Sequence, residues 1–186
     1  MSDFVTPTFR VSFPKVFTPS DDFKTGKLVY SIQMLFSKNG EDIKPIKKAM
    51  LDCLIEELGS EERAMNTIKS PVFKNPINDG DKKEFPSHKE HWYINTISKF
   101  CPGLVDQKRQ PIIDEDQFYA GCYARAQLAP FYWERQGKKG VSFSLQHIQK
   151  VKDGEKFVSR TEASDVFTDI ESSETKTTSS NSDLEF

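Results

Sequence analysis

Short segments in which apolar and polar residues alternate dominate this chain, and they constrain its fold more than any other feature. Residues 8–13 alternate strictly, and residues 28–36 place every second residue, each large and apolar, on one face. A period of two indicates half-buried β-strands. Strand character returns at residues 92–100, 122–135 and 141–151.

Proline and glycine mark where these predicted strands end. Pro14 is expected to stop the first strand, so that residues 14–27 form a loop. Pro130 should bend its strand or place it at a sheet edge. Residues 136–140 are typical of a hairpin loop, because they hold two glycines between two strand-like segments.

The period changes to that of a helix between residues 45 and 58, where apolar residues recur at helical spacing. Asp42 is a suitable N-cap and Gly59 a suitable stop, and a second short helix should begin at Ser60. A single helical turn is expected at residues 116–120. Strands and helices do not alternate regularly, so a doubly wound sheet is excluded. The pattern predicts a mainly β chain: a small closed or half-closed antiparallel barrel with one or two inserted helices.

Residues 69–91 form a long irregular segment with three prolines and five lysines. A loop of this length in a compact domain is usually functional. Its lysines could form a flexible clamp for phosphates, or the segment could be a solvated polar loop. The pattern leaves both interpretations open.

The charge of the chain is divided between two parts. Residues 161–186 hold seven Asp or Glu and one Lys, which gives −6, and since the whole chain carries −2, residues 1–160 carry +4. Apolar periodicity is lost after about residue 160, which predicts a disordered tail. We therefore expect a folded domain at 1–160 and an acidic tail at 161–186. The tail ends in Asp183, Leu184, Glu185 and Phe186, an anionic peptide with an apolar anchor suited to docking in a basic site.

Rings and cations alternate along the predicted strands, as in the surfaces that bind unpaired bases and phosphates. On a strand Tyr123 and Arg125 point the same way, so a base could stack on one while the other binds phosphate. The alternative is ordinary core or edge packing, above all for Tyr132 and Trp133. The candidates for base stacking are Tyr93, Tyr123, Tyr132 and Trp133. The candidates for phosphate binding are Arg10, Lys99, Arg125, Arg135, Lys138 and Lys139.

Other chemistries have little support. His88 and His91 lack the paired cysteines of a structural zinc site. Residues 114–116 are the one tight carboxylate cluster, and they are better explained as the cap of a short helical turn than as a nuclease centre. Cys53, Cys101 and Cys122 form no paired spacing, which indicates reduced thiols in a cytosol. We expect no metal, no cofactor and no catalysis.

Targeting signals are also missing from the sequence. The first residues contain no secretory apolar region, and no apolar run approaches the length that spans a membrane. We expect a soluble intracellular protein.

Several stretches resemble one family, the tailed-phage single-stranded-DNA-binding proteins once known as the domain of unknown function DUF2815. These stretches are Asn75-Pro76-Ile77-x-Asp79-Gly80-Asp81, His91-Trp92-Tyr93-Ile94-Asn95, Pro102-Gly103-Leu104-Val105-Asp106, Phe118-Tyr119-x-Gly121-Cys122-Tyr123-x-Arg125-Ala126 and the segment from Lys139 to Glu155. The resemblance implies an OB-fold and sequence-independent binding of single strands in phage DNA replication, recombination and repair, in the cytoplasm of a bacterial host.

The tail is similar in kind to those of bacterial and T7-type single-strand binders, where it recruits replication enzymes and competes with DNA. The resemblance implies that role for Asp183, Leu184, Glu185 and Phe186, although bacterial tails place a proline before the terminal Phe. Expected partners are single-stranded DNA and, through the tail, phage or host replication proteins. A homodimer is possible and no membrane is involved. Two alternatives remain open: a strand-annealing recombination mediator and a metal-dependent nuclease at Asp114, Glu115 and Asp116.

Overall fold

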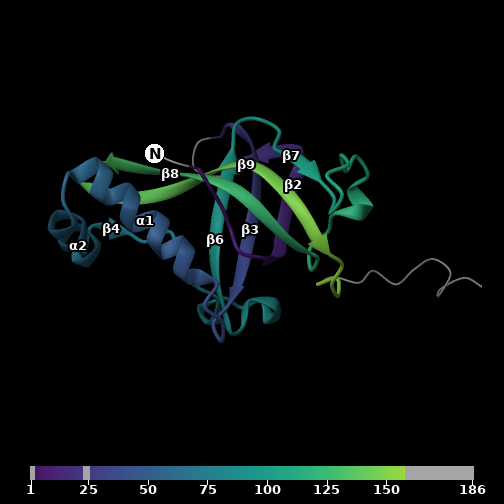
Figure 1. Cartoon of the computed structure of the whole chain (residues 1–186), viewed down its shortest axis with the longest axis horizontal. Helices are drawn as coiled ribbons and strands as arrows, with labels where there is room; N and C mark the ends of the chain where they lie inside the picture. Colours follow the sequence, from purple (N-terminus) through teal and green to yellow (C-terminus); the bar gives the residue numbers. More distant parts are fainter. Residues whose placement is uncertain (1–2, 23–25, 158–186) are drawn as a thin grey trace, which may run out of the picture.

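A computed structural model describes residues 3–22 and 26–157. The predicted acidic tail, including Asp183, Leu184, Glu185 and Phe186, lies outside the described residues. Strands account for most of the regular structure (Figure 1). Within the described residues the strands are β1 (Phe4–Val5), β2 (Phe9–Asp21), β3 (Leu28–Ser37), β4 (Phe73–Lys74), β5 (Asn78–Asp79), β6 (His91–Ser98), β7 (Gly103–Val105), β8 (Tyr123–Arg135) and β9 (Lys138–Lys152). The α-helices are α1 (Ile43–Leu58) and α2 (Glu61–Lys69).

Five long strands form a ring. β8, β2, β3, β6 and β9 follow one another in the sheet, and β8 also pairs with β9. The contact that closes the ring between β6 and β9 is parallel and joins Ile97 to Ser144. This order, with an antiparallel β8–β9 hairpin, is the connectivity of an OB-like barrel. The prediction of a mainly β, OB-like fold with inserted helices is confirmed. The sheet is mixed rather than purely antiparallel, because β9 runs parallel to β4, β6 and β7.

The core fills the inside of this ring. β3 places Ile32, Met34 and Phe36 inward, and β8 does the same with Ala124, Ala126 and Leu128. Helix α1 closes one side with its apolar stripe, in which Ile46 and Leu54 are fully buried. Burial of such side chains supplies the main driving force for folding. Figure 1 shows α1 and α2 toward one end of the long axis and β7 toward the other.

The first predicted loop is wrong. β2 continues through Pro14 as far as Asp21, where a loop was expected from residue 14. The pairing with β3 shifts register between Ser12 and Lys15, and Phe13 has a φ of 44°. Because a β-bulge interrupts the ladder there, the missing N–H of Pro14 costs no pairing and the strand can continue.

The two α-helix predictions are confirmed, with differences at the start of α1. α1 begins two residues earlier than expected and ends at Gly59, whose φ of 78° suits glycine. Asp42 stands at the N-cap position, but its side chain makes no capping hydrogen bond. Ser60 does cap α2, by accepting from the Arg63 N–H.

Candidate nucleic-acid interface

The predicted site residues fall in three separate places. Five of them gather at the outer end of the β8–β9 hairpin, three lie near the other end of the same two strands, and two belong to β6 or follow it. The first group, here called the hairpin arm, comprises Tyr132, Trp133, Arg135, Lys138 and Lys139. The second comprises Arg10, Tyr123 and Arg125, and the third comprises Tyr93 and Lys99.

The hairpin arm brings rings and cations together as predicted. Trp133 pairs with Gly140 across the hairpin, is half-buried, and donates from Nε1 to the Ser142 hydroxyl at 3.0 Å. Tyr132 packs partly against the core. Arg135 and Lys138 are opposite each other in the β8–β9 ladder, at its exposed tip. On the side away from β9, β8 pairs with β1 and β2 only before residue 129. From Pro130 onward that side of β8 is a sheet edge, as expected.

Arg10 is committed to contacts within the protein. Its guanidinium donates to the carbonyls of Gly121 at 3.2 Å and Glu155 at 2.9 Å. It also lies 4.4 Å from the ring centroid of Phe157 and 5.7 Å from that of Tyr123. These bonds hold the last described residues against the barrel, so a phosphate would have to compete with them.

Tyr93 is placed where a base cannot reach it. Its side chain is 8% exposed, and its ring meets His88 edge-on at 5.6 Å. Residues 80–90, here called the strap, cover this part of the outer face of β3 and β6. The neighbouring Trp92 points inward from β6 and is partly buried, so neither Trp92 nor the predicted stacking residue Tyr93 is a freely exposed ring. Lys99 follows β6 and is exposed.

A pair of exposed phenylalanines, not predicted from the sequence, lies on the outer face of β2, β3 and β6. Phe13 is 50% exposed and Phe85 is 46% exposed, and their rings meet edge-on at 5.3 Å. Exposed aromatic pairs are rare on surfaces that bind nothing, because rings bury much area when covered. We call these two residues the aromatic platform.

The backbone of Phe13 explains how its ring becomes exposed. The strand pattern predicts this side chain to face the core with Phe9 and Val11, but the bulge turns it outward. A φ of 44° is unfavourable for a bulky residue and persists only where the surroundings impose it. One signal was present in the sequence, since Phe13 and Phe85 each precede a proline, a position typical of irregular backbone.

Beneath the platform lies a polar chain of side chains. His88 is completely buried, its ring lies 6.0 Å from Phe13 and 5.5 Å from Phe85, and its Nε2–H donates to Gln33 Oε1. Gln33 Nε2 in turn donates to Asn95 Oδ1 at 2.7 Å. Burial, and then the positive charges of Lys83 and His91, lower the pKa of His88 from its usual value. The neutral imidazole therefore fixes the strap to β3.

Lys38 holds the other end of the strap. Its ammonium donates to Asp79 and to Asp81, the latter at 2.6 Å, and lies 4.6 Å from the centroid of the Trp92 ring. Hydrogen bonds to the two carboxylates raise the pKa of Lys38. The segment predicted as a lysine-rich loop is thus ordered by an ion-pair clasp. Lys69, Lys74, Lys82, Lys83 and Lys89 are all exposed along it or at its start, and Lys83 lies over Tyr93 at 5.5 Å.

The platform continues along the strands. Lys15 pairs with Ser31, and Ser31 pairs with Ile97, so these three side chains form a row across β2, β3 and β6. Ile97 is 47% exposed and Phe100, after β6, is 81% exposed. With the exposed cations Lys15 and Lys99, this face combines rings, apolar area and positive charge.

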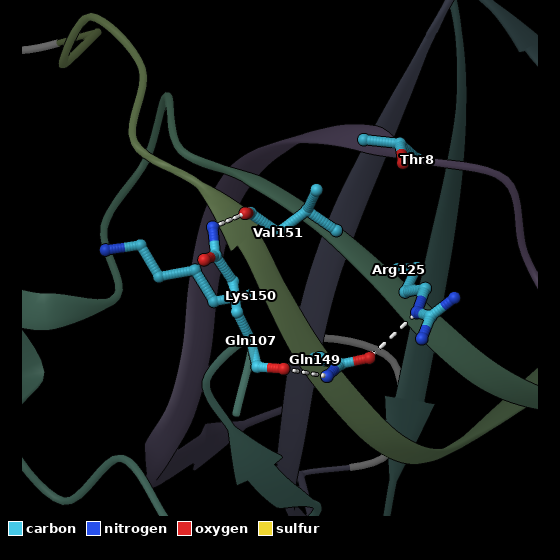
Figure 2. Close-up of a pocket in the computed structure, with 6 residues that line it drawn as sticks. All are labelled: Thr8, Gln107, Arg125, Gln149, Lys150 and Val151. Atoms are coloured by element: carbon cyan, nitrogen blue, oxygen red, sulfur yellow. Dashed lines mark hydrogen bonds between the residues drawn. The ribbon is translucent and has the colours of Figure 1, made fainter. Parts of the chain in front are cut away.

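A groove crosses the outer surface near the second group of predicted residues. It has a volume of about 320 Å³ and is lined by Thr8, Gln107, Arg125, Gln149, Lys150 and Val151 (Figure 2). Arg125 Nε donates to Gln149 Oε1 at 2.8 Å. Gln149 Nε2 donates to the Asp106 carbonyl at 3.0 Å, so the amide is fixed from both sides.

The residues considered for metal and thiol chemistry can also be placed. Within the described ranges, no three His, Cys, Asp or Glu side chains are grouped as a metal site would require. Asp114 accepts from the Asp116 N–H and caps a short turn, as predicted, but this 3₁₀ turn is Glu115–Gln117 and not the helical turn expected at residues 116–120. Cys53 and Cys122 are buried and Cys101 is exposed, and none of the three forms a disulfide within the described residues. None of the described helices is long and apolar enough to cross a bilayer.

Comparison with known proteins finds similarity to one family. Residues 2–178 match the family model described as the Enterobacter phage Enc34 ssDNA-binding protein. The chain is also 29% identical over 154 residues to putative protein p50 of Acyrthosiphon pisum secondary endosymbiont phage 1, across 80% of this chain and 82% of that protein.

Solved structures show the same fold. The Enc34 single-stranded DNA-binding protein in complex with ssDNA is 22% identical with a TM-score of 0.63, covering 84% of this chain and 89% of that one. Gp2.5, the single-stranded DNA-binding protein of bacteriophage T7, is 14% identical with a TM-score of 0.59, covering 87% and 98%.

Proposed function

This chain belongs to the family of the Enterobacter phage Enc34 ssDNA-binding protein, and on that premise we propose that it binds single-stranded DNA without sequence preference. The function is binding, with no chemical step. Affinity then comes from stacking and from phosphate contacts, neither of which depends on the identity of the base.

The aromatic platform is the observation that carries this proposal. OB-folds bind oligonucleotides on the face of their second and third barrel strands, which correspond here to β3 and β6. Phe13 and Phe85 stand exposed on that face, with Lys15 and Lys99 nearby. Unpaired bases would stack on the rings while the ammonium groups contact phosphates.

The hairpin arm extends this interface. In OB-folds the loop between strands four and five also contacts nucleic acid, and the β8–β9 turn takes that place here. Arg135 and Lys138 at the tip supply charge, and Trp133 supplies a half-exposed ring. Of the predicted residues, we retain Tyr132, Trp133, Arg135, Lys138 and Lys139 for this arm, with Lys99 at the platform.

Family membership also suggests a biological setting. We propose that the protein coats and protects single strands during phage DNA replication, recombination and repair in the cytoplasm of the bacterial host. The acidic segment 161–186 competes with DNA for the basic body, because its charge of −6 opposes the +4 of residues 1–160. Asp183, Leu184, Glu185 and Phe186 recruit phage or host replication proteins.

Titration of a fluorescein-labelled dT oligonucleotide tests the central proposal by fluorescence anisotropy. We expect tight binding at low salt that weakens steeply as salt rises. Binding releases counterions from the DNA, and this release contributes less to the binding free energy when the salt concentration is high. Oligonucleotides of mixed sequence should bind with similar affinity. A protein that shifts no oligonucleotide even at low salt would refute the function.

Intrinsic fluorescence separates the two parts of the interface. Trp133 lies on the hairpin arm, whereas Trp92 faces inward and lines an apolar pocket with Met50 and Ile77. DNA contact with the arm should therefore quench Trp133 and leave Trp92 unchanged. Comparison of Trp133→Phe with Trp92→Phe assigns the quenching to one indole.

A further inference from the structure

The groove of Figure 2 continues into a second hollow of about 280 Å³. Gln107 and Lys150 line both, and the second hollow adds Lys108 and Lys152 with the carboxylates of Asp106 and Asp153. We call the two together the β8–β9 groove. It lies on strands that do not pair with β3, the central strand of the platform face.

The carboxylates of this groove are already engaged. Asp106 Oδ1 accepts from the N–H groups of Lys108 and Gln110, both at 2.8 Å. Asp153 Oδ1 accepts from Lys150 Nζ at 2.6 Å and from the Tyr119 hydroxyl at 3.0 Å. The lining holds four cations, Arg125, Lys108, Lys150 and Lys152, against these two carboxylates, so the groove is positive by two charges.

Arg125 is held in a geometry suited to phosphate. Its Nε bond to Gln149 orients the guanidinium, and Gln149 is itself held by Asp106. Among residues 3–22 and 26–157, no carboxylate pairs with Arg125, so both terminal nitrogens remain available. A fixed guanidinium fork binds two oxygens of one phosphate better than a flexible ammonium does.

The ring of Tyr123 holds a second cation, Lys152, near Arg125. The Lys152 ammonium lies 4.6 Å from the centroid of Tyr123, which is partly exposed next to Arg125 on β8. The cation–π contact holds the ammonium above the ring and near the groove. The groove thus offers two placed cations and the Thr8 hydroxyl, with the ring of Tyr123 beside Lys152.

We propose that the β8–β9 groove is a second binding site for the sugar–phosphate backbone of an unpaired nucleic-acid strand, separate from the aromatic platform and the hairpin arm. It rests on the proposed function and adds a second strand-binding surface to it. Arg125 lies ten residues from Arg135 along β8, which corresponds to roughly 30 Å at strand spacing. The groove is therefore distinct from the hairpin tip and is reached either by a long strand or by a second one.

The test compares Arg125→Gln/Lys152→Gln with Arg63→Gln/Lys44→Gln, here called the α2 variant, which makes the same charge change on exposed positions of α2 and α1. Each protein is titrated with dT40 over a range of salt concentrations. We expect the groove variant to bind dT40 about tenfold more weakly, and its salt slope to fall by about 1.4, since each phosphate contact on a single strand contributes about 0.7. The α2 variant should stay close to wild type.

The number of dT8 molecules bound per protein shows whether the groove holds a second DNA strand or part of the same strand. If a second strand occupies the groove, wild type binds two dT8 molecules and the groove variant binds one. If one strand passes over both surfaces, dT8 stoichiometry stays at one and only dT40 affinity falls. Both outcomes support the groove. Arg125→Lys, which keeps the charge and loses the fork, should fall between wild type and the double variant.

A groove variant that matches the α2 variant in dT40 affinity, salt slope and dT8 stoichiometry overturns this inference. In that case Phe13→Ala and Phe85→Ala still report on the platform, and their loss of affinity would leave the proposed function standing. Far-UV circular dichroism of each variant confirms that the fold is retained.

Discussion

The indole of Trp133 lies directly against the backbone of Gly140, its partner across the β8–β9 hairpin. A Cβ at position 140 would stand 2.7 Å from Trp133 Cζ2 and 2.9 Å from the carbonyl oxygen of Lys74. The second clash is with backbone and cannot be relieved by rotating a side chain. We expect Gly140→Ala to lower the free energy of unfolding by about 1–3 kcal/mol, as overpacking does in a filled interior.

Urea denaturation followed by tryptophan emission measures this loss. Gly40→Ala is the matched control, because the nearest atom to its Cβ would be an Asp42 side-chain oxygen at an ordinary 3.5 Å. If both glycine variants are equally stable, the close approach of Trp133 is not what requires glycine at position 140.

Two substitutions of Phe13 should differ in stability but weaken DNA binding alike. Asn adopts positive φ more readily than other non-glycine residues, so Phe13→Asn relieves backbone strain that Phe13→Ala keeps. Both variants lose the ring. We expect the Asn variant to be more stable than the Ala variant by about 1 kcal/mol. Both should bind dT oligonucleotides about 5- to 150-fold more weakly, since stacking contributes about 1–3 kcal/mol per base. Denaturation and anisotropy titrations together decide the point.

Phe85 supplies the second ring of the platform. Phe85→Ala should lower ssDNA affinity by a similar factor with little change in stability, because the side chain is 46% exposed. Ile113→Ala, at a position 85% exposed and away from the platform, is the control and should leave affinity unchanged. Wild-type affinity in Phe85→Ala would remove this ring from the interface.

His88 makes stability depend on pH. Burial lowers its pKa in the folded protein, whereas in the unfolded chain it titrates near its usual value of about 6.5. The unfolded state therefore binds more protons below that value. The free energy of unfolding should be level above about pH 6.5 and fall as pH drops from there toward the lowered pKa. Protonation also places a proton on Nδ1, which now faces the Ser87 hydroxyl at 3.1 Å.

Denaturant titrations of wild type, His88→Gln and His147→Gln between pH 7.5 and 5 measure this effect. His147 is exposed, so its replacement should leave the pH dependence intact, while His88→Gln should flatten it. Asp79, Asp81 and Asp153 have lowered pKa values and contribute only in a more acidic window. An unchanged slope in His88→Gln would show that another group titrates.

Removal of residues 161–186 should tighten ssDNA binding. The deleted segment carries −6, so its loss removes an intramolecular competitor for the basic surface. The gain should be largest at low salt and shrink as salt screens both interactions. Salt-matched titrations of the full-length and truncated proteins test this, and equal or weaker affinity after truncation would exclude autoinhibition.

Local patterns in the sequence predicted most of the secondary structure. The alternation in residues 28–36 and the helical spacing in residues 45–58 correspond to β3 and α1, because burial on one face selects side chains at the period of the element. The β8–β9 hairpin could be predicted for the same reason, although its turn is shorter than the loop expected at residues 136–140, because β9 begins at Lys138. Its residues are close in sequence, and a tight turn determines the pairing of its strands.

The platform could not be predicted in this way. Phe13 and Phe85 are 72 positions apart in the sequence, and their contact depends on a bulge in β2 and on a strap anchored by His88 and Lys38. Tyr93 was predicted to be exposed but is covered. The alternation of apolar and polar residues in a strand does not show whether a distant segment covers its outer face.

The sequence alone determined that this chain forms a basic, mainly β body followed by an acidic segment, because composition and periodicity act over short stretches. Only the tertiary structure decided which rings meet solvent. Exposure depends on long-range packing, which turned Phe13 outward at a bulge and buried Tyr93 beneath the strap.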